Sequence, residues 1–432
     1  MKANRILDVV VIGAGHAGIS VSYYLKKENI PHMVFEKGRI GESWRSLRWD
    51  SFALNTPNWM NCLPEDTPPA KQKNNFYTKK EYIDYLQDFV NRNGLPILEN
   101  SKVIRLTKND RFKLFEIAFD LGRSTRYIFA KSIIVASGIL NVPKIPELSK
   151  RIGKQINQIH VSKYRNASQL PKGTVLVIGG GQSGCQVTED LLNAERKVYL
   201  SSSKVGRVPR RYRGRDFTEW FDLIKHWDEP IDKLADRSII TATNPLMSGV
   251  GTLGHSISLQ GLNKKGATIV GRLNNATLDV LHFEDNVKEH IQYADEYCKD
   301  IKKRIDAIIQ EKNISAACPK EDMDVSGDIS DVDITKLELK VHNITTIIWA
   351  TGFTGNFKWI QLPVLDQNYL PIHHKGESAV PGLVFFGFPW LASRKSGIVY
   401  GLNDEAQTAV KKIKDFLAES IKTGTTPESQ VP

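Results

Sequence analysis

The sequence predicts an α/β fold with two Rossmann-like dinucleotide-binding domains, the second inserted into a discontinuous first. Two glycine-rich turns, at 13–18 and 179–184, each stand between an apolar run and a helix pattern. Two further apolar runs, at 133–138 and 347–352, end in small residues and flank the second turn. The chain has 432 residues, which is long enough for two or three domains.

The first unit lies at the beginning of the chain. A continuous apolar run over 7–12 is typical of a strand that is buried on both faces of a parallel sheet. The turn at 13–18 follows directly, then a helix pattern to about Lys27 and a strand over 32–36. Strand, turn, helix and strand within about 30 residues form a βαβ nucleotide-binding unit.

The same order returns in the middle of the chain. A strand pattern over 174–178 leads into the turn at 179–184, a helix pattern to about Asn193 and a strand over 197–200. A single glycine-rich turn is a weak signal, but two copies in the same setting favour nucleotide binding over two plain turns.

The flanking runs indicate where the chain leaves the first domain and returns to it. We expect the first domain over 1–150 and 345–432, and the second over 165–344. The insertion at 210–330 is expected to shape substrate access.

The segment 285–312 carries apolar residues at alternating steps of four and three, as one helix face requires. These residues are Val287, Ile291, Ala294, Cys298, Ile301, Ile305 and Ile308. We expect a long amphipathic helix that packs on its own domain rather than a coiled-coil surface. The acidic, apolar-poor segment 321–333 is expected to be a solvated loop.

The residue that ends the second strand decides the ligand of each unit, because it contacts the adenosine ribose. In the first unit this residue is Glu36, whose carboxylate accepts hydrogen bonds from ribose hydroxyls and repels a 2′-phosphate. FAD or NAD is therefore expected there. The expected contacts are Gly13, Gly15, His16, Ala17, Gly18, Glu36 and Lys37.

In the second unit the equivalent position is Ser202, with Lys204 and Arg207 close behind. Hydroxyl donors and cations suit a 2′-phosphate, so NADPH is predicted. The alternative, a solvated basic loop, suits Arg213 and Arg215 better. The expected contacts are Gly179, Gly181, Gln182, Ser183, Gly184, Ser202, Ser203, Lys204 and Arg207. Two different dinucleotides in one chain predict a flavin enzyme that is reduced by NADPH.

Composition narrows the remaining function classes. The net charge is +11, but five arginines within the segment 207–215 make the excess local, which argues against a nucleic-acid partner. The four cysteines form no CxxC pair and have no zinc spacing, so we expect reduced thiols and no metal. No run of about 18 apolar residues and no signal peptide are present, which predicts a cytoplasmic protein without a membrane anchor.

With these motifs in place, the sequence resembles the flavin-containing monooxygenases of the single-chain type, close to bacterial flavoproteins similar to the indole-pyruvate monooxygenases. The resemblance runs from Leu7 to about Ala409, and includes the segment 41–45 (GESWR) and the segment 350–353 (ATGF). It implies further cofactor contacts from Trp44, Arg45, Gly138, Thr351, Gly352, Gly387 and Leu402.

The resemblance also implies one catalytic residue, Asn55, whose amide lies near the flavin hydroperoxide in that family. The alternative is that Asn55 and Pro57 only form a turn. The family pattern FxGxxxHxxxY is kept only in His160 and Tyr164, because Gly153 lies seven residues before His160. This departure argues against the N- and S-oxygenating branch, and Tyr164 argues against the Baeyer–Villiger branch.

The implied activity is an NADPH-dependent flavoprotein monooxygenase that inserts one oxygen atom from O₂ into a small organic substrate through a flavin hydroperoxide. The alternative is an NADPH-dependent flavin oxidoreductase that passes electrons to a quinone or a protein acceptor without oxygenation. A non-catalytic nucleotide-binding or redox-sensing protein is a third hypothesis, disfavoured by two intact fingerprints. The oligomeric state, including a homo-oligomer, stays open.

Overall fold

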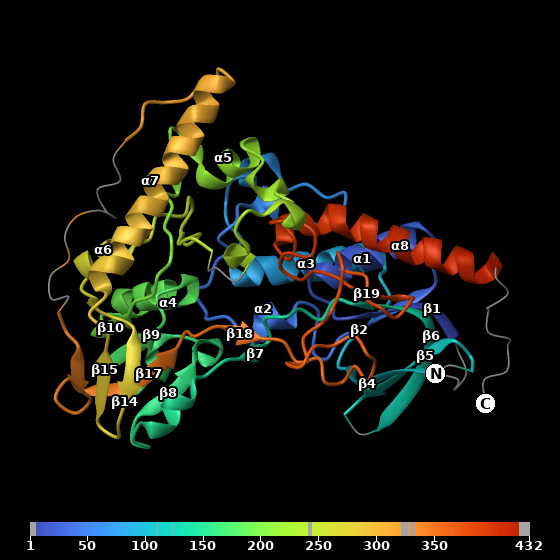
Figure 1. Ribbon diagram of the computed structural model, residues 1–432, viewed down its shortest axis with the longest axis horizontal. Coiled ribbons are helices and arrows are strands. Elements are labelled where there is room, and N and C mark those ends of the chain that lie inside the picture. The colour runs from blue at the N-terminus through green and yellow to red at the C-terminus, as the bar shows by residue number, and fades with distance from the viewer. Residues whose placement is uncertain are drawn as a thin grey trace.

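The computed structural model describes residues 6–109, 111–122, 124–240, 244–320, 327, 329 and 333–422. It consists of two α/β parts that lie side by side, each built around a sheet with parallel strands (Figure 1). The predicted fold class is therefore confirmed. Both glycine-rich turns connect a central strand of a sheet to a helix, as the two βαβ units require.

The first part contains a seven-stranded sheet in the order β3-β2-β1-β6-β5-β4, with β19 paired to β6. Strands β1, β2, β3, β6 and β19 are parallel, whereas β5 runs antiparallel to β6 and β4 runs antiparallel to β5. The strands are β1 (Ile6–Ile12), β2 (His32–Phe35), β3 (Ile97–Leu98), β4 (Lys102–Asn109), β5 (Leu114–Asp120), β6 (Thr125–Val135) and β19 (Leu383–Phe385). Its helices are α1 (His16–Lys27), α2 (Glu42–Ser46), α3 (Lys79–Asn93) and α8 (Leu402–Lys422).

The second part contains a five-stranded parallel sheet in the order β13-β10-β9-β17-β8. Its strands are β8 (Asn157–His160), β9 (Thr174–Ile178), β10 (Val198–Ser201), β13 (Thr268–Val270) and β17 (Ile344–Trp349), and its helices include α4 (Gln182–Asn193) and α6 (Leu259–Lys264). Because β8 and β17 pair in this sheet, it takes in residues on both sides of the predicted range 165–344. A three-stranded antiparallel sheet lies beside it, formed by β14 (Leu273–Ala276), β15 (Val280–Phe283) and β16 (Lys336–Glu338).

The chain crosses between the two parts twice, and the two crossings are paired. Strand β7 (Val142–Pro143) runs antiparallel to β18 (Phe353–Thr354). His160 reinforces the crossing, because its Nε2 lies 2.9 Å from the carbonyl oxygen of Gly352. The two covalent connections between the parts therefore lie side by side (Figure 1).

The predicted long helix is α7 (Val287–Glu311), which extends away from the second sheet (Figure 1). Its far half packs with α5 (Phe217–Leu223) and the two-stranded pair β11 (Arg211–Tyr212) and β12 (Arg215–Asp216), in a cluster that includes Trp220 and Ile305. The helix therefore packs on its own part of the molecule, as expected. Nearly all of the predicted acidic loop at 321–333 lies outside the described residues.

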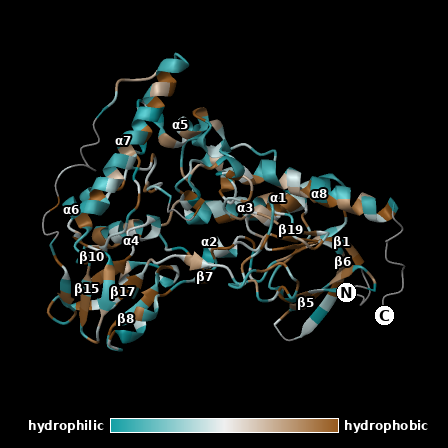
Figure 2. Cartoon of the chain, viewed as in Figure 1, coloured by the Kyte–Doolittle hydropathy of each residue, from teal (hydrophilic) through white to brown (hydrophobic). Residues whose placement is uncertain are grey.

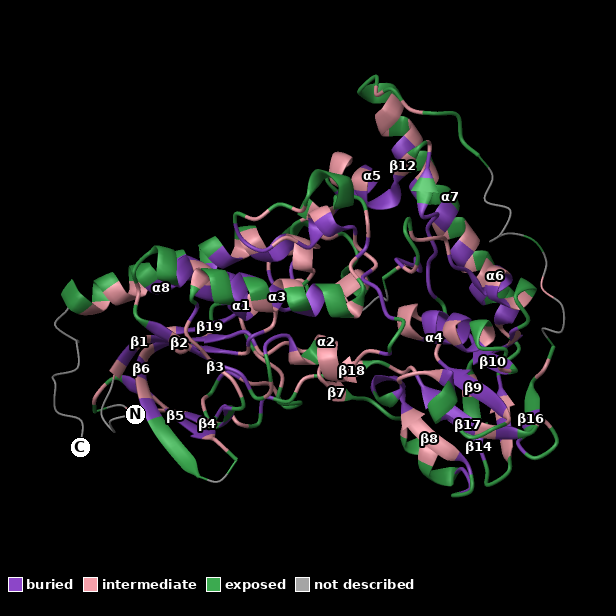
Figure 3. Cartoon of the chain, turned by 180° about the vertical axis from the view of Figure 1, so that it is seen from behind, coloured by how far each residue is buried: buried purple, intermediate pink, exposed green. Residues whose placement is uncertain are grey.

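The strands of both sheets form the interior. Val9, Val10 and Val11 of β1 are fully buried, as are Val175 and Val177 of β9. The hydropathy colouring shows the same apolar strands in both sheets (Figure 2), and they appear as buried ribbons when the molecule is seen from behind (Figure 3). This burial on both faces explains why their sequences are continuous apolar runs instead of alternating ones.

Candidate cofactor and active site

The two glycine-rich turns have the same backbone. Gly15 and Gly181 precede α1 and α4 with identical angles, φ −78° and ψ −175°. A Cβ on Gly18 would stand 1.8 Å from the carbonyl oxygen of Gly13, and a Cβ on Gly184 would stand 1.8 Å from that of Gly179. Only glycine allows each helix to start this close to its strand.

Open space lies above the ends of the strands, where a dinucleotide binds in this fold. A Cβ added at Gly15, Gly138 or Gly352 would meet no atom within 4 Å. Gly138 and Gly352 also have positive φ angles, 72° and 84°, so the chain turns away from this space after β6 and after β17. The three glycines therefore leave room for a ligand on the backbone.

Glu36 lies at the end of β2, as predicted, and is buried. Its carboxylate accepts hydrogen bonds from the backbone N–H groups of Ala14 at 2.8 Å and Gly38 at 2.9 Å. Burial raises its pKa, and the two N–H groups oppose that rise. Glu36 thus fixes the backbone of the turn through these two hydrogen bonds.

A cavity of about 390 Å³ lies against Glu36 and Gly13. Besides the predicted Lys37, its lining includes four residues that the sequence did not single out, Ser101, Asn141, Asn356 and Trp359. They follow strands or lie in loops far apart in sequence, so no local pattern indicates that they gather around Glu36.

His16 and Trp44 lie behind the first turn. Nδ1 of His16 lies 2.7 Å from the hydroxyl of Tyr82, and burial lowers the pKa of His16 to about 3. Trp44 packs edge-on against Tyr82 at 5.0 Å. Arg45 donates to the carbonyl oxygen of Ile40 at 3.0 Å.

Arg48 is a residue that the sequence reading did not single out. Its guanidinium lies over the rings of Trp44 and Phe52, at 5.3 and 5.5 Å. Burial lowers its pKa to about 10. Its hydrogen bond goes to the carbonyl oxygen of Leu47, and no carboxylate among the described residues pairs with it. A half-buried cation of this kind suits an anionic ligand.

The C-terminal candidates meet the first turn. A Cβ on Gly387 would stand 2.6 Å from the side chain of Ala17 and 3.7 Å from that of Leu402. Leu402 begins α8, which packs along α1. Three predicted residues from distant parts of the sequence are therefore neighbours.

The second turn has different surroundings at the end of its second strand. Ser202 is buried; its hydroxyl donates to the carbonyl oxygen of Val270 at 2.9 Å and lies 2.9 Å from Nδ1 of His290. It therefore bonds inward, whereas Ser203 lies against the turn and its Oγ accepts from the backbone N–H of Gly180 at 3.1 Å. Of the two serines, Ser203 stands closer to the turn.

The two predicted cations also differ from each other. Arg207 is almost buried, with Nε 2.6 Å from Asp295 and Nη1 3.6 Å from the Cys298 sulfur, both on α7. Lys204 is exposed and lies 3.6 Å from Glu289 at the beginning of α7. Lys204 can turn toward a phosphate, while Arg207 holds the long helix in place.

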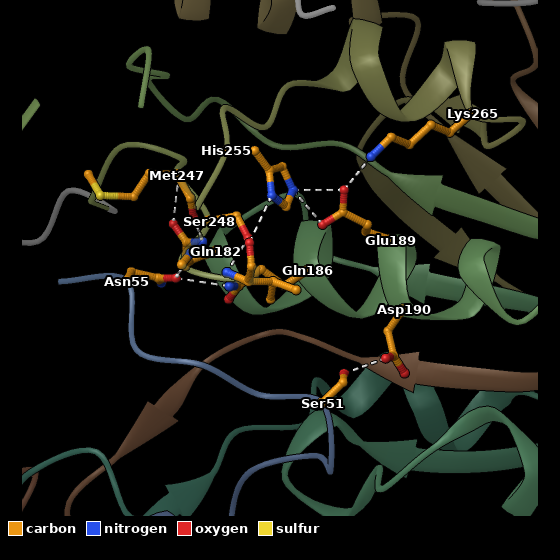
Figure 4. Close-up of polar contacts among 12 residues, drawn as sticks. Ser51, Asn55, Gln182, Gln186, Glu189, Asp190, Met247, Ser248, His255 and Lys265 are labelled. Atoms are coloured by element: carbon orange, nitrogen blue, oxygen red, sulfur yellow. Dashed lines mark hydrogen bonds and ion pairs between the residues drawn. The ribbon is translucent and has the colours of Figure 1, made fainter. Parts of the chain in front are cut away.

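Asn55 lies where the first part of the chain meets α4 (Figure 4). Its Oδ1 accepts from Nε2 of Gln186 at 2.9 Å and from the backbone N–H of Gly249 at 3.2 Å. Its backbone carbonyl accepts from Arg210 at 2.8 Å, and Arg210 is itself buried and paired with Asp216 at 2.6 Å.

The alternative role of Asn55 as a turn former finds no support in its contacts. The turn that follows is held by Asn61, which is fully buried and donates to the carbonyl oxygens of Thr56 at 2.8 Å and Pro57 at 3.0 Å. The side chain of Asn55 bonds instead to residues from the second half of the chain.

Helix α4 presents one face to the segment 247–255 (Figure 4). Gln182, in the predicted second turn, accepts from the backbone N–H of Met247 at 3.2 Å and donates to its carbonyl oxygen. Glu189, two turns further along, lies 2.9 Å from Nε2 of His255. Ser183, next to Gln182, is half-buried.

The two retained residues of the HxxxY pattern have structural partners. His160 contacts Gly352 at the chain crossing, and the hydroxyl of Tyr164 donates to Asp190 of α4 at 2.5 Å. Thr351 next to this crossing donates its hydroxyl to the carbonyl oxygen of Lys144. The contact of Tyr164 lies within the second part, whereas those of His160 and Thr351 stabilise the crossing between the parts.

The described residues contain no cluster of three or more His, Cys, Asp or Glu side chains that could hold a metal ion. The four cysteines, Cys62, Cys185, Cys298 and Cys318, form no disulfide bond with one another. No helix in the described part of the chain is long and apolar enough to cross a membrane.

Comparisons with known proteins agree with this geometry. A family described as pyridine nucleotide-disulphide oxidoreductase matches residues 10–213. An uncharacterized CzcO-like oxidoreductase of Geobacillus kaustophilus is 32% identical over 412 residues, covering 95% of this chain and 99% of its own length. The probable indole-3-pyruvate monooxygenase YUCCA7 of Arabidopsis thaliana is 25% identical over 252 residues, which are 57% of this chain and 58% of that protein.

Among solved structures, the flavin-containing monooxygenase from Stenotrophomonas maltophilia superimposes with a TM-score of 0.65 at 16% identity. The superposition covers 96% of this chain and 99% of that one. The fold is therefore shared over the whole length, although the sequences have diverged.

Proposed function

The chain belongs to the family of the CzcO-like oxidoreductases, and on that premise we propose that it is an FAD- and NADPH-dependent monooxygenase that inserts one oxygen atom from O₂ into a small organic substrate. The observation that carries the proposal is the pair of turns with one shared backbone, each beside a different strand end. Glu36 suits a ribose without a 2′-phosphate, and Ser203 with Lys204 suits a ribose that carries one.

Bound FAD would supply the redox chemistry of the reaction, which is the acceptance of hydride from NADPH and the activation of dioxygen. The chain would hold FAD with Gly15, Glu36 and the cavity that contains Trp359. It would hold NADPH with Gly181, Ser203 and Lys204. The free amide N–H groups of Asn55 would donate hydrogen bonds at the reacting centre, which is how a preorganised donor stabilises developing charge.

The protein needs few titratable groups for this reaction, because the cofactor carries the chemistry and the protein orients it and excludes water. The contacts of Asn55 support its place in the site. Its neighbours Gln186 and Arg210 are both buried, and burial strengthens each hydrogen bond in the network.

The test is the fate of labelled dioxygen. Purified protein with NADPH and isotopically labelled O₂ is screened against amines, sulfides, ketones and 2-oxo acids. We expect one labelled oxygen atom in the product of one of these classes, with NADPH consumption that matches product. If every class leaves all reducing equivalents as hydrogen peroxide, and a quinone is reduced rapidly under nitrogen, the protein is a reductase instead.

A further inference from the structure

The amide of Asn55 is held in one orientation. Its oxygen accepts two hydrogen bonds, from Gln186 and from the backbone of Gly249, whereas no described residue accepts from its nitrogen. A backbone N–H can only donate, so the contact with Gly249 requires the oxygen of the amide on that side. The N–H groups of Asn55 are therefore the free donors.

Gly249 can approach Asn55 only because it lacks a side chain. A Cβ at this position would stand 1.8 Å from the carbonyl oxygen of Leu54. The backbone of Gly249 thus lies directly on the segment 54–55, and it leaves Gln186 as the one side chain that bonds to Oδ1.

Helix α4 contacts the segment 51–55 at both of its ends, through an exposed hydrogen bond at Ser51 and a part-buried one at Asn55. Ser51 donates to Asp190, and Asn55 accepts from Gln186 (Figure 4). The two residues of the segment are four positions apart, and so are their two partners on α4, in the opposite chain direction. Gln186 is 4% exposed and lies one helical turn after Gln182, at the start of α4. The helix that begins at the second dinucleotide turn therefore sets the position of Asn55.

We propose that Gln186 is a positioning residue that turns the amide of Asn55 so that its N–H groups, and not its oxygen, serve the reaction. This inference rests on the proposed monooxygenase function. Because Gln186 and the second turn belong to one short helix, a nucleotide on that turn and the donor of Asn55 are mechanically linked. Gln186 acts only through Asn55 and touches no substrate.

The test compares four variants of the intact protein. Gln186→Met keeps the length of the side chain and removes its donor. Gln186→Glu replaces the donor by an acceptor, which attracts the N–H groups of Asn55 to itself. Asn55→Ala and the double variant Asn55→Ala with Gln186→Met complete a double-mutant cycle. Ser51→Ala is the matched control, since it removes the other link between the same segment and α4.

We measure the share of NADPH oxidation that ends as hydrogen peroxide, the anaerobic rate of flavin reduction, and unfolding in urea. Gln186→Met should raise the peroxide share about two- to tenfold, the scale of one net hydrogen bond, without changing the reduction rate. Gln186→Glu should raise it further. The double variant should be no worse than Asn55→Ala alone, and Ser51→Ala should match the wild type in peroxide share.

Each other outcome is decisive. If the losses of the two single variants multiply in the double variant, Gln186 does not act through Asn55. If Asn55→Ala raises the peroxide share and Gln186→Met does not, the contact is only structural. If Asn55→Ala also leaves the share unchanged while the wild type oxygenates a substrate, the role of Asn55 and this inference fail together but the monooxygenase assignment stands. If the wild type oxygenates no substrate, the proposed function itself fails.

Discussion

The turns at 13–18 and 179–184 agree in backbone geometry and differ in what surrounds them. In the first unit, the strand β2 is followed by a carboxylate, Glu36, which accepts hydrogen bonds from two backbone N–H groups of the same unit. In the second unit, the strand β10 is followed by serines. The cations beyond them pair with acidic residues of α7, and Arg207 and Asp295 are 88 residues apart in the chain. The glycine motif determines the shape of a turn, and residues from elsewhere in the chain determine what surrounds it.

The largest difference between the two turns should appear in cofactor binding when a bulky side chain is placed in each turn separately. Gly15→Val places a branched side chain in the open space over the first turn and should abolish flavin binding, which gives a colourless protein. Gly181→Val, at the equivalent position, should give a yellow protein that NADPH no longer reduces. Flavin absorbance measures the cofactor content of each variant, and the anaerobic rate of flavin reduction by NADPH measures the function of the second turn. A yellow Gly15→Val protein with full flavin content would refute the assignment of the first turn.

A smaller effect on stability should be equal in the two turns. Gly18→Ala and Gly184→Ala each place a methyl group 1.8 Å from a backbone carbonyl oxygen, and each should lower the free energy of unfolding by about 1–3 kcal/mol or more. Gly15→Ala, whose methyl group meets no atom within 4 Å, is the control. Urea unfolding measures the three, and a stable Gly18→Ala variant would show that the helix can move away from its strand.

The two turns should differ in how their stability depends on pH. His16 follows Gly15 in the first turn, whereas Gln182, which does not titrate, follows Gly181 in the second. Burial lowers the pKa of His16 from 6.5 to about 3. Between these two pH values His16 is protonated in the unfolded chain and neutral in the folded protein. The stability from neutral His16 is present above pH 6.5 and falls as the pH drops toward 3, by about 1.4 kcal/mol per pH unit.

The variant His16→Gln copies the second turn and should remove this dependence. Urea unfolding of wild type and variant at several pH values measures the difference. Buried His226 has a pKa that burial also lowers to about 3, and it is present in both proteins, so its contribution cancels. Parallel pH curves for the two proteins would mean that His16 is protonated inside the folded protein.

The smallest expected effect distinguishes the two cations of the second turn. Lys204→Ala should raise the KM for NADPH about three- to tenfold and leave that for NADH unchanged, because an exposed lysine contributes a screened charge to the 2′-phosphate. Arg207→Ala should affect both cofactors equally and lower the free energy of unfolding by about 0.5–1 kcal/mol, since it removes the ion pair with half-exposed Asp295, which keeps its hydrogen bonds from Gln260. Steady-state kinetics with both cofactors decide, and a selective loss in Arg207→Ala would reverse these roles.

The sequence predicted the features that local patterns encode. Both turns, the strands that precede them, the position of Glu36 and the long helix follow from glycine spacing and apolar periodicity, which act over short distances. The partners of Ser202, Arg207 and Asn55 could not be predicted in this way, because each lies far along the chain. Arg207 and Asp295 are 88 residues apart, and Asn55 and Gln186 are 131 residues apart.

The residues that line the cavity near Glu36 likewise include some that a local pattern predicts and some that it does not. Lys37 follows Glu36 directly and was predicted, whereas Trp359 reaches the cavity only after the chain has returned from the second part. Arg48 could have been noticed as a cation between two aromatic residues in sequence, Trp44 and Phe52, but its lack of a carboxylate partner is visible only in three dimensions.

The paired crossing of β7 and β18 makes the second part of the molecule an insertion whose two ends lie next to each other. Entry at Pro143 and exit at Phe353 lie opposite each other in one antiparallel pair. A foreign nucleotide-binding unit grafted between these two positions would join the chain at one place, but it would also have to supply the partners that α4 gives to Ser51 and Asn55. The first sheet, which closes through β1, β6 and β19, would keep its own hydrogen bonds after such an exchange.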